Sequence, residues 1–398
     1  MIKKLLTALL LICMLALLVI AWNRAGSSYV TEAMRESFGE IIVTDAITTE
    51  LPETTESPVT DVPPETAPVT TAATTSVPEE PVYPDTVLLF GGDVNLDANY
   101  GVWPAYAGAE GDLAACIDPA LLTEMRGADI FMLGNLFAFT DSTQKISKRY
   151  TFRTVPENVT ILSELGADIV SLANNHVYDF GAAGLTDTLF ALDNQGIIHV
   201  GAGENIADAA RVRYGIFNGL RIAYTAAMRS EKYINTPEAT ENSSGVMKMY
   251  TLDAYLDVIR QAAANSDFVV AYVHWGAENS LWLEQEQIDG ARMLIDAGAD
   301  IVIGSHTHTL QTVEYYNGRP IFYSVGNLWS DMQKTESALV KVTLSSDGSI
   351  REVGLIPCEN EGGRTSLATP DRRAAILARL NQSSTAFISQ DGIITEKK

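Results

Sequence analysis

The string Gly-Ala-Asp-Ile occurs three times in this chain, at residues 127–130, 166–169 and 298–301. Each copy follows an amphipathic stretch, such as PENVTILSEL or EQIDGARMLIDA, and leads into an apolar run. Glycine suits the left-handed residue that ends many helices, and a continuous apolar run is typical of a buried strand. The residues around the copies do not match, so the pattern reflects architecture and not sequence duplication. It predicts a layered α/β fold.

Polar residues follow these predicted strands and two further apolar runs. The segments are GN at 134–135, ANNH at 173–176, GSHTH at 304–308, and the ends of TVLLFGGD and DFVVAYVHWG. In layered α/β folds, ligands bind beyond the carboxyl ends of the strands. We therefore expect five strands to bring polar side chains to one edge of the molecule.

Histidine is concentrated at these strand ends. Of the five histidines in the chain, only His199 does not follow a predicted strand. The other four are His176, His274, His306 and His308. The same segments also carry Asp93, Asn95 and Asn175. This mixed nitrogen and oxygen set suits one or two ions of Mn, Zn, Fe, Co or Ni better than it suits Ca or Mg. In an extended segment, alternation would point both imidazoles of the His-Thr-His triplet to one side.

Composition limits the partners of this chain. With 27 Lys and Arg against 50 Asp and Glu, the formal net charge is -23, which disfavours binding to nucleic-acid phosphates. Cys13 lies in an apolar run, which leaves Cys116 and Cys358 as one possible pair whose bonding the spacing does not decide. The sequence shows no Gly-rich phosphate loop, no Ser-His-Asp order and no Cys nucleophile pattern.

Residues 1–24 predict a single membrane anchor or a signal segment. Two lysines precede an uncharged apolar run from Leu5 to Trp22, which as a helix would be about 27 Å long and would nearly span a bilayer. The lysines favour the cytoplasmic side, so we expect the rest of the chain to be extracellular. A mediocre cleavage site near Ala25 leaves secretion open as the alternative to a single-pass membrane protein.

Residues 25–84 predict a disordered, acidic tether. From residue 43 onward this part is dominated by Thr, Pro, Glu and Val, and it is too polar and too interrupted by proline to pack. Apolar runs and helical periods begin at Asp85. We expect one domain over residues 85–358, followed by a C-terminal helix and tail over residues 359–398.

Five segments, taken in chain order, carry a family resemblance. They are LLFGGDVNLD, SLANNHVYDFGAAGLTDTL, VVAYVHWGAE, GADIVIGSHTHTLQ and PIFYSVGNLWSD. They resemble the CapA/PgsA family of poly-γ-glutamate capsule synthesis proteins, which is similar to the calcineurin-like metallophosphoesterases. The resemblance implies a four-layer αββα sandwich of metallophosphoesterase type with a dinuclear metal site. It also implies a function in the metabolism of a capsule, of poly-γ-glutamate or of another cell-envelope polymer.

The resemblance assigns roles to the candidate residues. One ion would be held by Asp93 and His308, with Asn95 standing where phosphoesterases usually have histidine. A second ion would be held by Asn175, His274 and His306. His176 would donate a proton to the leaving group. Asp179 would either orient His176 or cap the helix that begins after it.

Further residues are candidates for substrate binding. They are Asn135, Lys148, Arg149, Arg153, Glu278 and Asn327. The basic stretch STQKISKRYTFRTVP contains three of them, and it is either a clamp for an anionic polymer or a solvated loop with incidental charges.

One position departs from the family pattern. Where the family has a glutamate that would bridge the two ions, this chain reads MLGNLFAFTD, with Leu136 or Phe137 at that place. Neither side chain coordinates a metal, so the second site should be weakened. Two hypotheses remain. One is a metal-dependent hydrolase acting on a phosphoester or amide, and the other is a non-catalytic polyanion-binding component of a membrane synthase or export complex.

Overall fold

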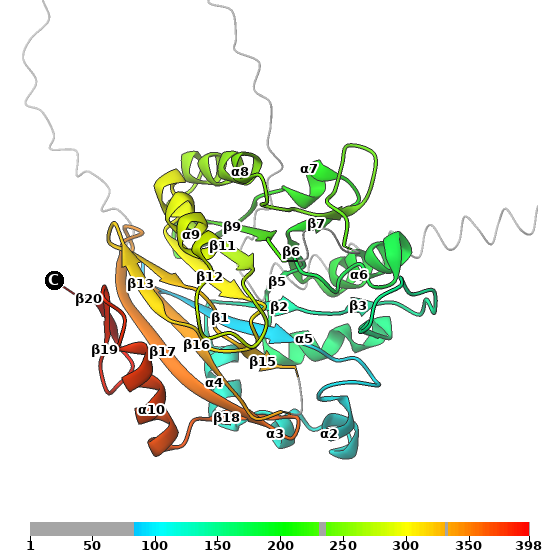
Figure 1. The fold of residues 1–398 in the computed structure, drawn as a ribbon, viewed down its shortest axis with the longest axis horizontal. Helices are drawn as coiled ribbons and strands as arrows, with labels where there is room; N and C mark the ends of the chain where they lie inside the picture. Colours follow the sequence, from blue (N-terminus) through cyan, green and yellow to red (C-terminus); the bar gives the residue numbers. More distant parts are fainter. Residues whose placement is uncertain (1–82, 231–235, 331–332, 398) are drawn as a thin grey trace, which may run out of the picture.

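Two β-sheets that lie face to face form the centre of the molecule (Figure 1). The computed structural model describes residues 83–230, 236–330 and 333–397. The larger sheet has the strand order β18-β17-β16-β1-β2-β5-β6, with β15 also paired to β1, and the smaller has the order β13-β14-β12-β11-β9-β8. The described part is therefore a sheet-rich, mixed α/β fold, as the recurring helix and strand pattern predicted.

The larger sheet is mixed, with a parallel part and an antiparallel part. Strands β2, β5, β6 and β15 run in the same direction as β1, whereas β16, β17 and β18 form an antiparallel meander. Its strands are β1 (Thr86–Val94), β2 (Ile130–Asn135), β5 (Ile169–Ser171), β6 (Ile198–Val200), β15 (Asn327–Trp329), β16 (Thr335–Leu344), β17 (Ile350–Glu361) and β18 (Arg364–Leu367).

The smaller sheet is parallel in its centre and antiparallel at both edges. Its strands are β8 (Arg213–Phe217), β9 (Leu220–Met228), β11 (Phe268–His274), β12 (Ile301–Ser305), β13 (Val313–Tyr316) and β14 (Arg319–Phe322). The turn between β13 and β14 holds Asn317 and Gly318 at φ 50° and 74°, the left-handed pair that an Asn-Gly hairpin requires.

Alternation along β11 divides the apolar side chains between two cores. Val270 and Tyr272 point into the first core, which they share with residues of the larger sheet such as Phe90. Val269 and Ala271 belong to a second core on the other face of the smaller sheet. Because successive side chains of a strand point to opposite faces, one buried strand contributes to both cores.

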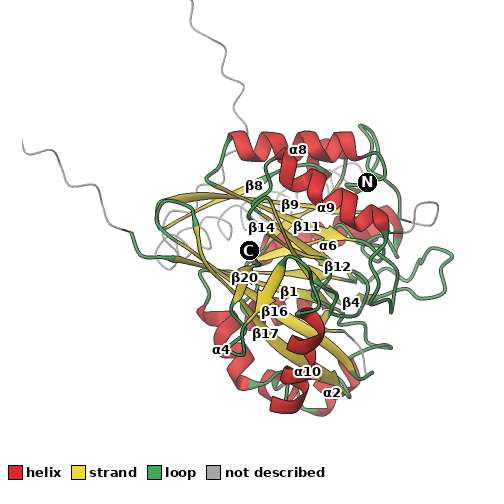
Figure 2. Cartoon of the chain, turned by 60° about the vertical axis from the view of Figure 1, so that its left-hand side comes forward, coloured by secondary structure: helices red, strands yellow, loops and turns green. Residues whose placement is uncertain are grey.

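Helices cover the outer faces of the two sheets. Helices α8 (Leu252–Ala264) and α9 (Gln285–Ala297) pack on the second core, and α4 (Pro119–Gly127) and α10 (Pro370–Leu380) lie beyond the larger sheet (Figure 2). Helix α6 (Gly181–Gln195) packs against β6. The shorter elements are α2 (Trp103–Gly108), α3 (Leu113–Cys116), η1 (Pro156–Val159), α5 (Thr160–Leu165), α7 (Ile206–Ala209), β3 (Ala138–Phe139), β4 (Arg153–Thr154), β7 (Ala202–Gly203), β10 (Gly245–Val246), β19 (Ala386–Ile388) and β20 (Ile394–Glu396).

The glycines of the recurring string do not all act alike. Gly166 and Gly298 follow α5 and α9 in the left-handed conformation, with φ of 90° and 117°, as predicted. Gly127 is instead the last residue of α4, and the extended residue after that helix is Ala128. The helix-to-strand order holds at all three copies, but the left-handed stop holds at two of them.

The expected boundary at residue 358 is not a boundary in the structure. Strand β17 runs through it without interruption, and Ile376 and Leu377 of α10 belong to the first core. The C-terminal part is therefore an integral part of the domain. The sequence pattern did not predict this, because an amphipathic helix at a chain end has the same apolar period whether or not it packs on the domain core.

The predicted anchor, residues 1–24, lies outside the described residues, as does the tether up to residue 82. Within the part that is described, none of the helices combines the length and apolar character needed to cross a bilayer. Cys116 and Cys358 are both free and buried, and burial raises the pKa of the Cys358 thiol to about 12.

Candidate functional site

The carboxyl ends of strands from both sheets meet at one edge of the molecule. The backbone N–H of His306, which follows β12, donates to Asp93 Oδ2 at 3.2 Å across 213 residues of sequence. His274 Nε2, at the end of β11, lies 3.1 Å from Asn175 Oδ1, which follows β5. These two contacts between the sheets bring together four of the five strand ends for which convergence was predicted.

The His-Thr-His segment is bent, not extended. His306 and His308 have φ of 88° and 57°, in the left-handed region where a side chain costs roughly 1–3 kcal/mol per residue. The rings still gather, because the ring centroids of His274 and His306 are 4.5 Å apart and those of His306 and His308 are 6.0 Å apart. The predicted clustering is therefore achieved by a strained turn, and the explanation from strand alternation is wrong. Strain of this kind concentrates at functional sites.

Burial sets the charge state of this cluster. Desolvation raises the pKa of Asp93 to about 6, although the electrostatic interaction with the nearby His308 opposes the rise. Desolvation also holds the pKa values of His274 and His306 well below the usual 6.5, and the neighbouring histidines add to this effect. Two imidazoles are therefore neutral at neutral pH, which is the form of histidine that binds a metal ion.

Several buried atoms at this edge have no hydrogen-bond partner among the described residues. They are Asp93 Oδ1, Asn95 Nδ2, Asn135 Oδ1 and His306 Nδ1. An unsatisfied buried polar group costs roughly 1–3 kcal/mol, so these atoms need an explanation. Asp93 Oδ1, Asn135 Oδ1 and His306 Nδ1 carry or can carry lone pairs that a cation would satisfy.

The donor set therefore fits a divalent cation, with amide oxygens completing it. In the described ranges, no group of three or more His, Cys, Asp or Glu side chains is arranged to hold a metal by itself. Asn175 Oδ1 already lies beside His274 Nε2, whereas Asn95 Oδ1 accepts the backbone N–H of Asp97 at 3.0 Å.

His176 and Asp179 form a buried pair beside this cluster. His176 Nδ1 lies 2.6 Å from Asp179 Oδ2, which also accepts the backbone N–H of Phe152 at 2.8 Å. The residue before α6 is Phe180, and no side chain caps that helix. Of the two roles that the sequence left open for Asp179, orientation of His176 is the one that the contacts support.

The basic stretch is divided between the interior and the surface. Lys148 Nζ lies 3.4 Å from Asp179 Oδ1 and donates to the Asn175 carbonyl, and its side chain is only 10% exposed. Arg153 donates from its guanidinium to the Thr140 carbonyl at 2.9 Å. Arg149 is exposed. The stretch is therefore not wholly solvated, and of its three candidate residues only Arg149 is exposed.

The last two candidates for substrate binding lie in different environments. Asn327 is buried, and its Oδ1 lies 2.9 Å from His308 Nδ1, so it is placed to orient that ring. Glu278 is exposed in the loop after β11.

Two residues that hold the site in place were missed from the sequence. Ser305 Oγ lies 2.9 Å from His274 Nδ1. Asn174 Oδ1 accepts the backbone N–H groups of His176 and Val177 at 2.9 and 3.0 Å, and its Nδ2 donates to the Asn135 carbonyl at 2.7 Å. Both lie within the ANNH and GSHTH motifs, so an Asx turn at Asn174 was the available signal.

The structure distinguishes the two apolar residues at the place of the missing glutamate. Phe137 is part of the first core and meets Phe139 edge to face, with ring centroids 4.8 Å apart. Leu136 is 1% exposed but belongs to neither apolar core of the described residues. Leu136 is therefore the position at which a carboxylate would displace the fewest core contacts.

Replacing Leu136 by glutamate is expected to raise the metal occupancy of the purified protein toward two ions per chain. An added carboxylate at this place would bridge two cations and offset their repulsion. Leu136→Gln, which has the same size without the charge, should leave the metal content unchanged. Phe137→Glu should unfold the protein, because it removes a core aromatic. Unchanged metal content in a folded Leu136→Glu protein would show that the bridging position lies elsewhere.

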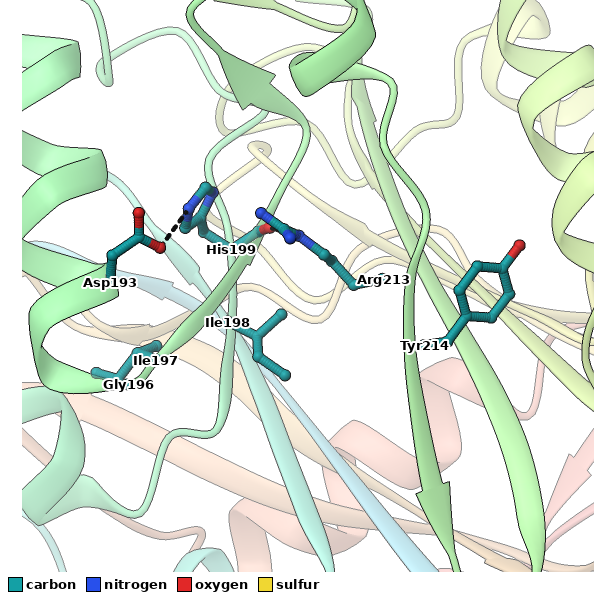
Figure 3. Close-up of a pocket in the computed structure, with 7 residues that line it drawn as sticks. All are labelled: Asp193, Gly196, Ile197, Ile198, His199, Arg213 and Tyr214. Atoms are coloured by element: carbon teal, nitrogen blue, oxygen red, sulfur yellow. Dashed lines mark hydrogen bonds and ion pairs between the residues drawn. The ribbon is translucent and has the colours of Figure 1, made fainter. Parts of the chain in front are cut away.

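Three cavities lie away from the candidate ligands. Two of them, of about 250 and 330 Å³, share Asp193, His199 and Arg213, and Figure 3 shows the first, with His199 bonded to Asp193. The third, of about 590 Å³, is lined by residues of α9, β13 and α10. None of the candidate metal ligands lines these three cavities, so His199 stands apart from the other histidines, as the sequence predicted.

The comparisons with known proteins point to one family. The model of the bacterial capsule synthesis protein PGA_cap matches residues 87–332. The chain is 35% identical to the capsule biosynthesis protein CapA of Bacillus anthracis over 213 residues, which are 52% of this chain and 51% of that protein. It is 32% identical to the PGA biosynthesis protein CapA of Bacillus subtilis over 250 residues, which are 58% of this chain and 65% of that protein. The matches thus span between half and two thirds of these relatives.

Among solved structures, a phosphatase of Mycoplasma pneumoniae aligns with a TM-score of 0.45 at 12% sequence identity, covering 70% of this chain and 95% of that one.

Proposed function

This chain belongs to the PGA_cap family of bacterial capsule synthesis proteins, and we propose that it is a metal-dependent hydrolase that acts on a phosphoester or amide in an envelope polymer. The observation that carries the proposal is the convergence of buried metal-binding side chains from both sheets beside the His176–Asp179 pair. A buried acid–base pair next to unsatisfied ligand atoms is the arrangement that metal-assisted hydrolysis needs.

The finer description of the fold belongs to this proposal. Two facing sheets with helices on their outer faces are consistent with the four-layer sandwich of metallophosphoesterases, in which the strand ends hold a dinuclear site. The first ion would be held by Asp93 and His308, and the second by Asn175, His274 and His306. Mn, Zn, Fe, Co and Ni suit these nitrogen and oxygen donors. When bound, such a cation supplies a Lewis acid and lowers the pKa of a water molecule.

The chain's own residues supply the proton transfer and the positioning. With Nδ1 of His176 bonded to Asp179, proton donation to the leaving group is assigned to Nε2. Lys148 holds the other oxygen of Asp179 and the Asn175 backbone in one arrangement. Ser305 and Asn327 orient His274 and His308 through Nδ1, which directs the opposite nitrogen of each ring to a ligand.

Leu136 favours a second candidate function. Without a bridging carboxylate the chain would bind an anionic polymer, without turnover, as one component of a membrane synthase or export complex. In both cases we propose that residues 1–24 anchor the protein in the cell membrane, with the domain outside, or direct its secretion if they are cleaved. The net charge of -23 disfavours a nucleic-acid partner in either case.

The two functions are separated by two measurements on one preparation. The hydrolase should purify with at least one transition-metal ion per chain and should turn over a generic aryl phosphate in a manner that a chelator abolishes. A protein that binds metal but hydrolyses neither phosphoesters nor amides would support the second candidate function, the non-catalytic polymer-binding component. If the protein bound no metal and showed no turnover after reconstitution with Mn or Zn, the hydrolase proposal would be overturned.

A further inference from the structure

A ladder of aromatic rings leads from the candidate site to the solvent. The His176 ring is 4.2 Å from the ring of Phe152, which is 4.9 Å from that of Tyr100, and Tyr100 is 5.9 Å from Tyr150, all between ring centroids. His176 and Phe152 are each 7% exposed, whereas Tyr100 and Tyr150 are 40% and 47% exposed. The outer end of the ladder is therefore accessible, and its inner end touches the proposed proton donor.

Buried carboxylates hold this ladder in place. Asp97, which is 4% exposed, accepts the backbone N–H groups of Asn99 and Arg153, both at 2.8 Å, and so ties the loop of Tyr100 to the segment of Phe152, which leads into β4. Asp179 accepts the N–H of Phe152 itself. Asp97 thus fastens two segments that are distant in sequence, and Asp179 joins one of them to His176, so the rings are positioned before any ligand arrives.

The outer end of the ladder also carries a positive charge. The guanidinium carbon of the exposed Arg149 lies 5.0 Å from the centre of the Tyr150 ring. Cation–π contact holds such a guanidinium against the ring while its N–H groups remain suited to a bidentate bond with a carboxylate. On a chain with a net charge of -23, this places a local cation beside two half-exposed rings.

We propose that Tyr100, Tyr150 and Arg149 form a subsite for a sugar ring that bears a carboxylate, so that the ligand is an acidic polysaccharide. Phe152 stacks on one face of Tyr100, and Arg149 lies over one face of Tyr150. The two tyrosine rings are still 40% and 47% exposed, and their exposed surface suits the apolar face of a sugar ring while Arg149 suits its carboxylate. An acidic polypeptide offers the charges but no ring to stack, so it would use Arg149 alone. The assignment rests on the proposed function in one respect: it places the bound sugar at the outer end of the ladder whose inner end is the proton donor of that reaction.

The test measures binding of the full-length protein to a uronic-acid oligosaccharide at low salt, with poly-γ-glutamate of equal charge as the competitor. Wild type should prefer the uronate. Tyr150→Ala and Tyr100→Ala should each weaken uronate binding by roughly 2- to 10-fold, and Tyr150→Phe should not. Arg149→Glu should weaken the binding of both polymers, most strongly at low salt. Metal content is measured in parallel and should not change.

The matched controls lie elsewhere on the surface. Tyr83→Ala removes a tyrosine of similar exposure, 44%, that precedes β1 at its opposite end, and Arg260→Glu reverses an exposed arginine of α8. Both should bind uronate as wild type does.

The inference is overturned if wild type does not bind uronate, or if the tyrosine variants bind it unchanged. Equal or tighter binding of poly-γ-glutamate would identify an acidic polypeptide as the occupant instead. If wild type contained no metal and showed no turnover but the tyrosine variants still bound uronate more weakly, the proposal of a hydrolase would be overturned and the sugar subsite would stand.

Discussion

Replacing His176 by alanine is expected to reduce hydrolysis by roughly 10²–10⁴-fold, because it removes the group that protonates the leaving oxygen or nitrogen. The loss should depend on the leaving group. The nitrophenolate released from a nitrophenyl phosphate departs without protonation, so this substrate should be affected least. The alkoxide released from an alkyl phosphate needs a proton, so that substrate should be affected most. Asp179→Asn should retain the proton donor but orient it poorly, with a loss of roughly 10–100-fold. The measurement is kcat for both substrates at saturating metal.

The chain contains a matched control for this pair. His199 Nε2 lies 3.2 Å from Asp193 Oδ1, so it is a second buried histidine bonded to an aspartate, away from the strand ends (Figure 3). His199→Ala should leave kcat within about twofold of wild type for both substrates, since the site lies elsewhere. If His176→Ala and His199→Ala behaved alike, or if the loss were the same for both leaving groups, His176 would not be the proton donor.

The second large effect is expected when His306 is replaced by glycine. Wild type should gain about 2.7 kcal/mol of unfolding free energy at a metal concentration 100 times the Kd, and the variant should lose most of that gain. Because His306 has a φ of 88°, glycine relieves backbone strain. The metal-free variant should therefore melt no lower than metal-free wild type. The check is thermal unfolding with and without Mn or Zn, together with metal analysis.

Loss of the metal-induced gain without loss of metal-free stability distinguishes a metal-binding histidine from one that only supports the fold. A histidine that only fills space should lower the melting temperature of the metal-free protein when it is removed. His308→Gly, at a φ of 57°, should repeat the pattern, and His199→Ala should keep the full metal-induced gain. Retention of that gain in both glycine variants would show that neither histidine binds metal.

Much of the molecule was determined by short-range patterns in the sequence. The period of the apolar residues predicted the helices and the buried strands, because each depends on residues within a few positions of one another. The Asn-Gly turn of the β13–β14 hairpin depends on two adjacent residues and was likewise readable. The concentration of histidines after strands was visible for the same reason, since strand ends can be counted along the chain.

Only the tertiary structure decided which of those residues meet. Asp93 and His306 are 213 residues apart in the sequence, and His274 and Asn175 are 99 apart, so their contacts depend on how two sheets face each other. The stacking of Tyr100 on Phe152 depends in the same way on a loop held by Asp97. No local period encodes these distances.

The structure also decided between roles that the sequence could not separate. Asp179 precedes helix α6 whether it caps that helix or orients His176. Only the position of His176 Nδ1 shows that the Asp179 carboxylate contacts the histidine. Leu136 and Phe137 are adjacent and both buried, yet only Phe137 belongs to the core. The sequence by itself predicted the alternation of helices and strands, the family and the side chains of the candidate site. The packing of the two sheets determined the site, because side chains from distant strands meet only when the layers are assembled.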